Sequence, residues 1–271
     1  MAQKWGFGFK AGGSWTSIQG PLEPGETVGY QGGIHIGPQV TYKLLPKFGF
    51  YSGLAYNQAG SKYEYKGKGY FLFRSFLKDI LVSGDVETKL LVEHSYVEIP
   101  LGIYYKPFKK LEVFGGVSLN ILAGSTAKGT MSFNNPGKDL DFNVLLDYNY
   151  LKDKAGEVGG VFKSRVGYNY SKVIRGIKYD VPNTLGAYYF YNEEIKKKKY
   201  NTLDYGVLAG LKYYLNSALY LSLRGYWGLS DITNNSVDLK YTLDPNAPDK
   251  LPKSSDIDKN IVYQLSLGFA F

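Results

Sequence analysis

The feature that most constrains the fold is the alternation of apolar with small or polar residues along the chain. Successive side chains of a β-strand point to opposite faces, so a period of two indicates strands with one apolar face. In the last such segment one face carries Ile261, Tyr263, Leu265, Leu267, Phe269 and Phe271, and the other carries Asn260, Val262, Gln264, Ser266, Gly268 and Ala270. About eight segments share the pattern, and they cover residues 5–15, 34–43, 48–57, 96–106, 111–123, 203–215, 219–229 and 260–271.

The connections between these segments alternate in length. Short turns are predicted at 45–47, 107–110 and 216–217, and long connections at 19–27, 61–93, 124–199 and 231–259. Outer-membrane barrels alternate in this way, with short periplasmic turns and long extracellular loops. An even number of strands leaves both chain ends on the side of the short turns. A ten-stranded barrel is the alternative if part of 161–191 pairs within the membrane.

The distribution of bulky residues indicates a membrane barrel rather than a soluble one. The mean hydropathy is −0.24, and no apolar run approaches the roughly 18 residues of a membrane helix. Bulky faces pointing inward on every strand would overfill a small barrel, whereas glycines and a few charges fit its narrow lumen. Closure also leaves no unpaired sheet edge, as a bilayer requires.

We therefore predict an all-β fold with a single domain over residues 1–271. It is a transmembrane, up-and-down, antiparallel β-barrel of eight strands in the bacterial outer membrane, with short periplasmic turns and long extracellular loops at about 61–93, 124–199 and 231–259. We expect that a signal peptide has been removed, because the first strand follows Met1 almost directly.

Several strands resemble those of a known family. Residues 96–105 (YVEIPLGIYY) are similar to the fourth strand of PorT-like outer-membrane β-barrels of Bacteroidetes, and 113–124, 204–210, 224–232 and 264–271 are similar in style. The resemblance implies an accessory role in secretion or envelope complexes. The long insertion between Thr126 and Lys199 departs from shorter relatives, so no loop function is carried over.

The end of the chain resembles the signal that the barrel-assembly machinery reads. Its residues are Tyr263, Leu265, Leu267, Phe269 and Phe271. The resemblance implies this machinery as a partner during insertion, beside the lipid and lipopolysaccharide of the outer membrane.

Ionisable residues fall on the predicted lumen face, which predicts a polar network. The candidates are Lys10, His35, Glu98, Glu112, Asp204, Lys212 and Arg224, with Lys43 and Lys106 near the strand ends. They could form a proton or ion path, or a salt-bridged plug that satisfies the polar groups of a narrow lumen. The plug is the favoured interpretation, with Glu98 paired to Arg224 or Lys10 near the centre.

The composition argues against most catalytic chemistry. Cysteine is absent and only two histidines exist, so we expect no thiolate nucleophile, no metal site, no cofactor and no catalytic residues. His94 lies between Glu93 and Ser95, but neighbours on a strand point to opposite faces and cannot form a triad.

The long connection at 124–199 is rich in tyrosine and lysine. Lys163, Arg165, Lys196, Lys197, Lys198 and Lys199 are candidate contacts for a partner protein or for lipopolysaccharide, the alternative being a solvated strand region. The spacing of apolar residues over 71–81 predicts a short amphipathic helix. The barrel pattern argues against nucleic-acid binding.

Three functions follow from these observations. The first is a non-enzymatic accessory or scaffold barrel that binds other outer-membrane proteins through its extracellular loops. The second is a narrow channel for small solutes, and the third is a lipid-modifying enzyme.

Overall fold

The computed structural model describes residues 4–271 except 76, 158–167, 175, 194–195 and 248–249. Its elements are β1 (Trp5–Gln19), β2 (Glu26–Leu45), β3 (Phe48–Gly53), β4 (Ala55–Phe73), β5 (Ile80–Phe108), β6 (Leu111–Asn135), η1 (Pro136–Lys138), β7 (Leu140–Asn149), β8 (Tyr168–Ile174), β9 (Ile177–Pro182), β10 (Thr184–Leu185), β11 (Leu203–Tyr214), β12 (Leu219–Gly228) and β13 (Lys259–Ala270). Within these residues no helix is long and apolar enough to cross a membrane.

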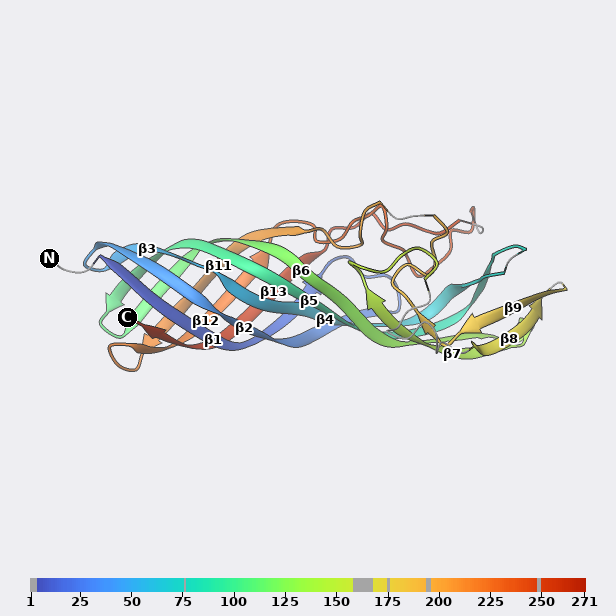
Figure 1. The fold of residues 1–271 in the computed structure, drawn as a ribbon, viewed down its shortest axis with the longest axis horizontal. Coiled ribbons are helices and arrows are strands. Elements are labelled where there is room, and N and C mark those ends of the chain that lie inside the picture. Colours follow the sequence, from blue (N-terminus) through green and yellow to red (C-terminus); the bar gives the residue numbers. More distant parts are fainter. Residues whose placement is uncertain (1–3, 76, 158–167, 175, 194–195, 248–249) are drawn as a thin grey trace.

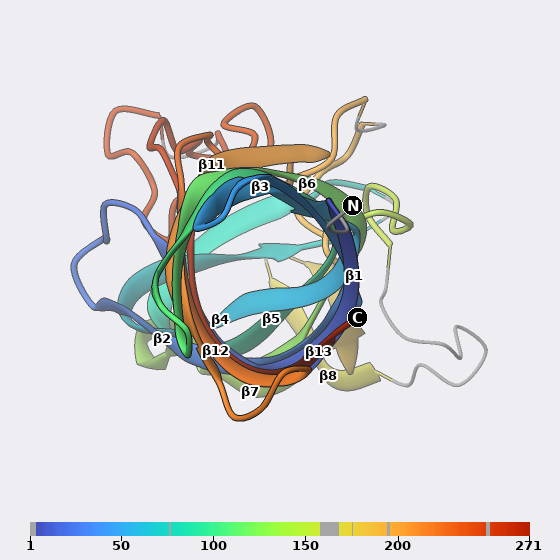
Figure 2. The same cartoon turned by 90° about the vertical axis from the view of Figure 1, so that its left-hand side faces the viewer.

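Eight strand positions close into an antiparallel ring, which confirms the predicted barrel. The order is β1, β2, β3 with β4, β5, β6, β11, β12 and β13, and β13 pairs back with β1 (Figure 2). Strands β3 and β4 occupy one position, interrupted at Leu54. Strands β8 and β9 form a separate hairpin, and β10 pairs with β7, so the ten-stranded alternative is wrong.

Both chain ends lie at one end of the barrel, which we call the proximal end (Figure 1). The short turns that join β2 to β3, β5 to β6 and β11 to β12 begin and end within a few residues of the predicted positions. The rest of the chain extends away from this end, and we call that region the distal part.

The outward face of the ring near the proximal end is apolar. Its exposed side chains include Trp5, Trp15, Leu101, Leu119, Val207, Leu223 and Leu265. On β4 this face changes from Tyr56 to Lys62 and Glu64, which marks where the apolar belt stops. The belt therefore covers only the proximal part of the strands, as a protein that crosses a bilayer and continues beyond it requires.

Strands β5 and β6 are far longer than a membrane crossing needs. They contain 29 and 25 residues, whereas about 9–11 tilted residues span a bilayer. The expected loop 61–93 is thus formed largely by continuing strands, and the expected loop 124–199 partly so, with hairpin pairing between β4 and β5 and between β6 and β7. The distal part is therefore built on long β-hairpins, and the irregular connection between β12 and β13 is added to them.

The distal part has its own apolar core, which we call the distal core. At its centre lie Phe71, Phe73, Phe133, Phe142 and Tyr179, each at most 6% exposed. The ring centroids of Phe71 and Phe142 are 4.9 Å apart in an edge-to-face arrangement. Such aromatic packing holds the long hairpins together without help from lipid.

The helix predicted over 71–81 is wrong. Strand β4 continues to Phe73, and β5 begins at Ile80. Residues from Tyr70 to Phe73 are all buried, because this end of β4 is covered on both faces. A strand buried on both faces gives a continuous apolar run, which periodicity cannot distinguish from a buried helix. Arg74 fixes the turn by donating to the backbone oxygens of Tyr189 and Tyr191.

Large aromatic side chains share the lumen with glycines. A Cβ atom at Gly268 would lie 2.2 Å from Cζ of Tyr220 on the neighbouring strand. Tyr220 is fully buried, and Gln39 donates to its hydroxyl at 2.5 Å, so the ring has no room to retreat. Because Gly268 has no side chain, it leaves the space that the Tyr220 ring occupies.

We predict that Gly268→Ala lowers the free energy of unfolding by about 1–3 kcal/mol, because the added methyl overpacks the lumen. Gly115→Ala is the matched control: its Cβ would meet its nearest neighbour, the Leu208 oxygen, at 3.5 Å, an ordinary contact. Urea unfolding in lipid vesicles, followed by tryptophan fluorescence, measures both. Equal stability of the two variants would contradict the packing argument.

Candidate functional site

Three regions of the molecule gather polar or charged groups in a way that suggests function. The first is the lumen of the ring, the second is a groove in the distal part, and the third is a pocket at the distal mouth of the ring. Each is built by residues from several strands or loops, so each depends on the fold described above.

The centre of the lumen holds an ion pair between β5 and β12. Arg224 donates to Glu98 Oε1 at 2.5 Å and to Oε2 at 2.8 Å, a bidentate arrangement. His35 Nε2 lies 3.7 Å from Glu98, and Ser118 donates to the same carboxylate. Glu98, Arg224 and His35 are at most 4% exposed. Lys10 faces the same level, and no ion pair of its side chain is found among the described residues.

A second ionic group closes the lumen toward the proximal end. Glu112 lies 2.8 Å from Lys212 Nζ and 3.2 Å from Lys106 Nζ, and it accepts a hydrogen bond from Tyr214. Lys212 also lies 5.1 Å from the ring centroid of Tyr220. The carboxylate is therefore balanced by two lysines.

A third polar group lies toward the distal end of the lumen around Asp204. Its carboxylate accepts hydrogen bonds from Asn120 at 3.3 Å, Asn260 at 3.0 Å and Ser230 at 2.7 Å. All of these partners are neutral. The three groups, with tyrosines between them, fill the lumen with paired polar side chains, and this is the arrangement expected of a plug.

The second histidine makes a contact that the sequence did not indicate. His94 Nδ1 lies 3.0 Å from Ser125 Oγ on β6, and the imidazole packs against the Tyr200 ring at 4.3 Å. A serine hydroxyl next to a histidine imidazole is the pair from which many nucleophilic sites are built, because the imidazole can act as general base. His94 and Ser125 are at most 2% exposed, however, so a substrate has no access to this pair.

A groove of about 1390 Å³ lies in the distal part, between the tip of the β4–β5 hairpin and the β8–β9 hairpin. Its floor is apolar and includes Leu72, Ile80, Ile174, Ile177 and Phe190. Its lysines outnumber its acidic residues: Lys78, Lys138, Lys172, Lys196, Lys197 and Lys253 face Asp79 and Glu193. Lys172 pairs with Asp139, whereas no ion pair of the other five lysines is found among the described residues.

The lysine run 196–199 divides into two halves. Lys196 and Lys197 are exposed and line the groove. Lys198 donates to the backbone oxygen of Asp153, and Lys199 Nζ lies 2.7 Å from Asp238, so internal partners hold both. Lys163 and Arg165 lie outside the described residues. Only half of the run therefore faces the groove.

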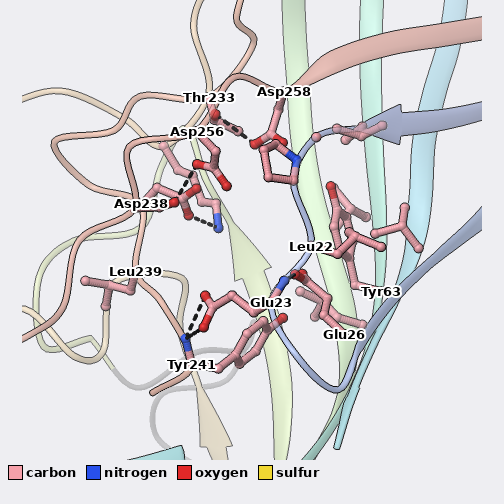
Figure 3. A pocket seen from close by; sticks show the side chains of 18 of the residues that line it. Leu22, Glu23, Glu26, Tyr63, Thr233, Asp238, Leu239, Tyr241, Asp256 and Asp258 are labelled. Atoms are coloured by element: carbon pink, nitrogen blue, oxygen red, sulfur yellow. Dashed lines mark hydrogen bonds and ion pairs between the residues drawn. The ribbon is translucent and has the colours of Figure 1, made fainter. Parts of the chain in front are cut away.

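The third region, which we call the mouth pocket, lies where β1 ends and β13 begins (Figure 3). It encloses about 80 Å³. Its carboxylates are Glu23 and Glu26 from the β1–β2 connection and Asp238, Asp256 and Asp258 from the β12–β13 connection. The backbone N–H of Tyr241 donates to both oxygens of Glu23, at 3.1 and 3.3 Å, and so joins the two connections.

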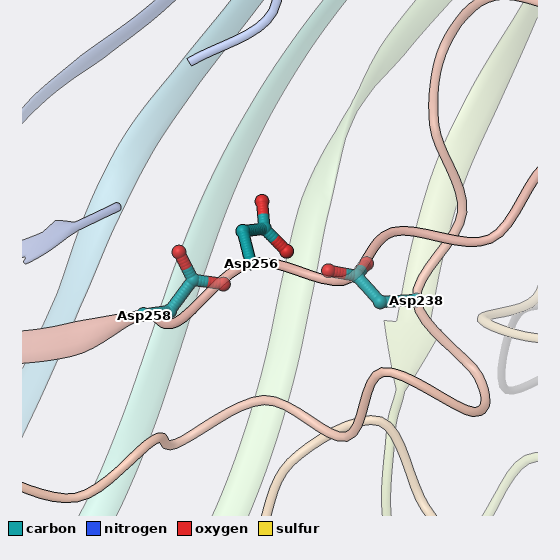
Figure 4. A group of neighbouring side chains, drawn as sticks. All are labelled: Asp238, Asp256 and Asp258. Carbon is teal, nitrogen blue, oxygen red and sulfur yellow. The ribbon is translucent and has the colours of Figure 1, made fainter. Parts of the chain in front are cut away.

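Three of these carboxylates lie side by side. One oxygen each from Asp238, Asp256 and Asp258 lies within 4.8 Å of the others (Figure 4). Burial, and then the charges of Asp256 and Asp238, raises the pKa of Asp258 to about 6, although Thr233 donates to it at 2.9 Å. Burial also raises the pKa values of Glu23 and Glu26. Burial and the neighbouring carboxylates thus make the ionised forms of Asp258, Glu23 and Glu26 less favourable than they would be in water.

A family model described as "Outer membrane protein beta-barrel domain" matches residues 1–234. The chain belongs to this family. It is accordingly a protein of the bacterial outer membrane, so its apolar belt faces lipid, its proximal end faces the periplasm and its distal part lies outside the cell.

Solved structures of other outer-membrane barrels are also similar to this outer membrane protein. The attachment invasion locus protein Ail of Yersinia pestis has 8% identity and a TM-score of 0.37, covering 99% of this chain and 100% of that one. OprG from Pseudomonas aeruginosa has 13% identity and a TM-score of 0.35, covering 99% and 97%. The outer membrane protease OmpT from Escherichia coli has 9% identity and a TM-score of 0.29, covering 99% and 97%.

At these scores the similarities carry no argument about what the barrel does. No curated protein matches the sequence.

The last strand of this outer-membrane barrel presents the residues that resemble the assembly signal. Tyr263, Leu265, Leu267 and Phe269 are exposed on the outward face of β13, and Phe271 follows the strand. The residues of the mouth pocket, in contrast, gave no sequence signal, because Asp238 is separated by a long loop from Asp256 and Asp258. The folding of the β12–β13 connection brings them together: Leu239 pairs with Lys253, and the Ser254 N–H donates to the backbone oxygen of Asp238.

We predict that Arg224→Met costs about 3–5 kcal/mol of stability, because it leaves the buried Glu98 carboxylate without its counter-charge. The double variant Glu98→Gln/Arg224→Met should recover part of this loss, since the buried carboxylate that Arg224 balances is removed as well. Urea unfolding in lipid vesicles of both single variants and the double variant gives the coupling energy. Additive effects would show that the pair does not interact as the structure implies.

Proposed function

We propose that this protein is a non-enzymatic outer-membrane barrel that binds a partner protein in its distal groove. The observation that carries the proposal is the combination of an apolar floor with five lysines for which no ion pair is found among the described residues. Apolar burial supplies affinity, while lysines select and orient an acidic partner. The expected occupant is an extended segment with apolar side chains flanked by Asp or Glu.

A protein fits this groove better than lipopolysaccharide does. The groove begins near Ile80, whereas the apolar belt on β5 begins near Val97, which pairs with the exposed Tyr56 of β4. At about 3.3 Å per residue, this separation along the strand is on the order of 50 Å. The phosphates of lipid A lie at the membrane surface, which is too far away to occupy the groove. Figure 1 shows β8 and β9 at the end of the molecule opposite both chain ends.

The lumen supports binding rather than transport. Glu98 and Glu112 are ion-paired there, and Asp204 accepts hydrogen bonds from neutral groups. Buried tyrosines lie between these groups: Tyr51, Tyr96, Tyr220 and Tyr226. A path for solutes would require these groups to separate, and breaking a buried ion pair is costly. The inaccessible contact between His94 and Ser125 likewise argues against lipid modification by this barrel.

The sequence resemblance to PorT-like barrels concerns the strands of the ring, and it supports a place for this protein in a larger assembly. We propose that the protein is an accessory subunit of a secretion or envelope complex, whose other members meet the distal part. The packed distal core fits a scaffold, because it holds the walls of the groove in one shape.

We predict that a photo-crosslinking amino acid in place of Ile177 captures a protein in native outer membranes, and that the crosslinked peptide is acidic and apolar. Lys196→Glu/Lys197→Glu should reduce the yield severalfold, because it reverses the charge at the groove. The matched control is Lys62→Glu/Lys128→Glu, which changes two exposed lysines outside the groove by the same charge. Mass spectrometry identifies the product.

Two results would contradict the proposal. One is a crosslink to lipopolysaccharide alone, and the other is a protein crosslink that charge reversal in the groove leaves unchanged. Planar-bilayer recording tests the channel alternative separately, and we expect no steady conductance from the intact barrel.

A further inference from the structure

Both walls of the distal groove contain strand edges that have no neighbouring strand among the described residues. One wall is the distal end of the β4–β5 hairpin, and the other is the β8–β9 hairpin, which forms a two-stranded sheet of its own. Figure 1 shows the two hairpins as separate arms, one teal and one yellow. An unpaired edge presents a row of backbone N–H and C=O groups with which another strand can pair.

The open edge of the first wall is the beginning of β5. Pairing between β5 and β6 begins only at Asp85, which lies opposite Asn134, and β6 ends at Asn135. Residues 80–84 therefore pair with β4 on one side and, within the described part of the chain, have no strand partner on the other. Leu81 belongs to this segment and lines the groove.

Two side-chain hydrogen bonds show which way the backbone of Leu81 points. In an antiparallel pair, residues that bond to each other alternate with residues whose N–H and C=O point outward. The backbone oxygen of Leu72, which lies opposite Leu81, accepts from the Tyr189 hydroxyl at 3.2 Å and so points away from β5. Two residues after Leu81, the backbone oxygen of Ser83 accepts from the Asn135 amide at 2.7 Å and so points away from β4. The N–H and C=O of Leu81 therefore face the open edge.

The lysines around the groove determine which kind of strand this edge attracts. Lys78 precedes β5, Lys138 ends η1, and Lys196 and Lys197 line the same groove. Lysines beside an open edge protect it from pairing with a second copy of the same chain, because like charges repel. A strand that carries Asp or Glu is attracted instead, since opposite charges across a strand pair are favourable.

We propose that the groove binds its partner by strand addition, with an acidic segment paired to the open edge of β5 at Leu81. This inference rests on the proposed function, because it specifies how the groove holds a protein segment. In strand addition, main-chain hydrogen bonds give affinity and pockets for alternate side chains give specificity. Successive side chains of the bound strand face opposite ways, so its sequence should alternate apolar residues, which meet the floor, with acidic residues, which meet the lysines.

Amide hydrogen exchange tests the open edge in the protein alone. In refolded protein in detergent micelles, the Leu81 amide should exchange more than about tenfold faster than the Val82 amide, because only the Val82 N–H faces β4. NMR spectroscopy resolves the two amides. Equal protection of both would show that the edge is closed, and it would overturn strand addition whatever the groove binds.

Leu81→Pro tests the pairing itself, because it removes the outward N–H without removing a hydrogen bond to β4. Proline is tolerated at such edge positions. Leu81→Ala is the matched control, since it shortens the side chain but keeps the N–H. With the photo-crosslinking amino acid at Ile177 in native outer membranes, Leu81→Pro should lower the yield of captured protein about three- to tenfold, as for a lost hydrogen bond. Leu81→Ala should lower it by a smaller factor.

The outcomes separate this inference from the proposed function. If Lys196→Glu/Lys197→Glu lowers capture at Ile177 but Leu81→Pro lowers it no more than Leu81→Ala, strand addition is overturned and groove binding stands. If no protein is captured, both are overturned. The urea midpoint in lipid vesicles reports whether each variant is folded, and if Leu81→Pro is not, the ratio of the two exchange rates in the unaltered protein decides.

Discussion

The rule that a sheet within a bilayer leaves no backbone group unpaired governs this structure. The ring meets it by pairing β13 with β1, so every strand in the lipid has two neighbours. Closure then determines the two faces of the sheet. Bulky apolar side chains face the lipid, and the inward-facing glycines, tyrosines and ionisable side chains share a narrow lumen. Gly268 beside Tyr220 and Glu98 beside Arg224 are two solutions to that crowding, one steric and one electrostatic.

The same strands build a second structure outside the membrane. Because β5 and β6 continue far beyond the apolar belt, the hairpins they form have no lipid to cover them. The distal core replaces the lipid, and Phe71 and Phe142 pack there as they would in a soluble protein. The groove depends on this core, since Leu72, Val82 and Tyr179 belong to both. The mouth pocket lies against a second buried cluster, which includes Val92, Tyr150 and Tyr200. A barrel with short strands and irregular loops would carry neither.

Period-two alternation was sufficient to predict the ring, its turns and the face on which Glu98 and Arg224 lie. The distal strands were not predicted. Tyr70–Phe73 is buried on both faces and so shows no alternation. Earlier on β4, Lys62, Glu64 and Lys66 do alternate with Tyr63 and Tyr65, but there the outer face is polar and meets water, unlike the apolar outer face that identifies the strands of the ring. The mouth pocket could not be predicted from the sequence, because the folding of the β12–β13 connection decides which carboxylates lie close together.

The placement of the belt and of the distal part is tested most directly by accessibility in intact cells. The chain contains no cysteine, so single substitutions give clean labels. A membrane-impermeant maleimide should label Lys62→Cys in intact cells, Lys47→Cys only after the outer membrane is opened, and Leu223→Cys in neither case. Labelling of Lys47→Cys in intact cells, or of Leu223→Cys in any state of the folded barrel, would contradict the account.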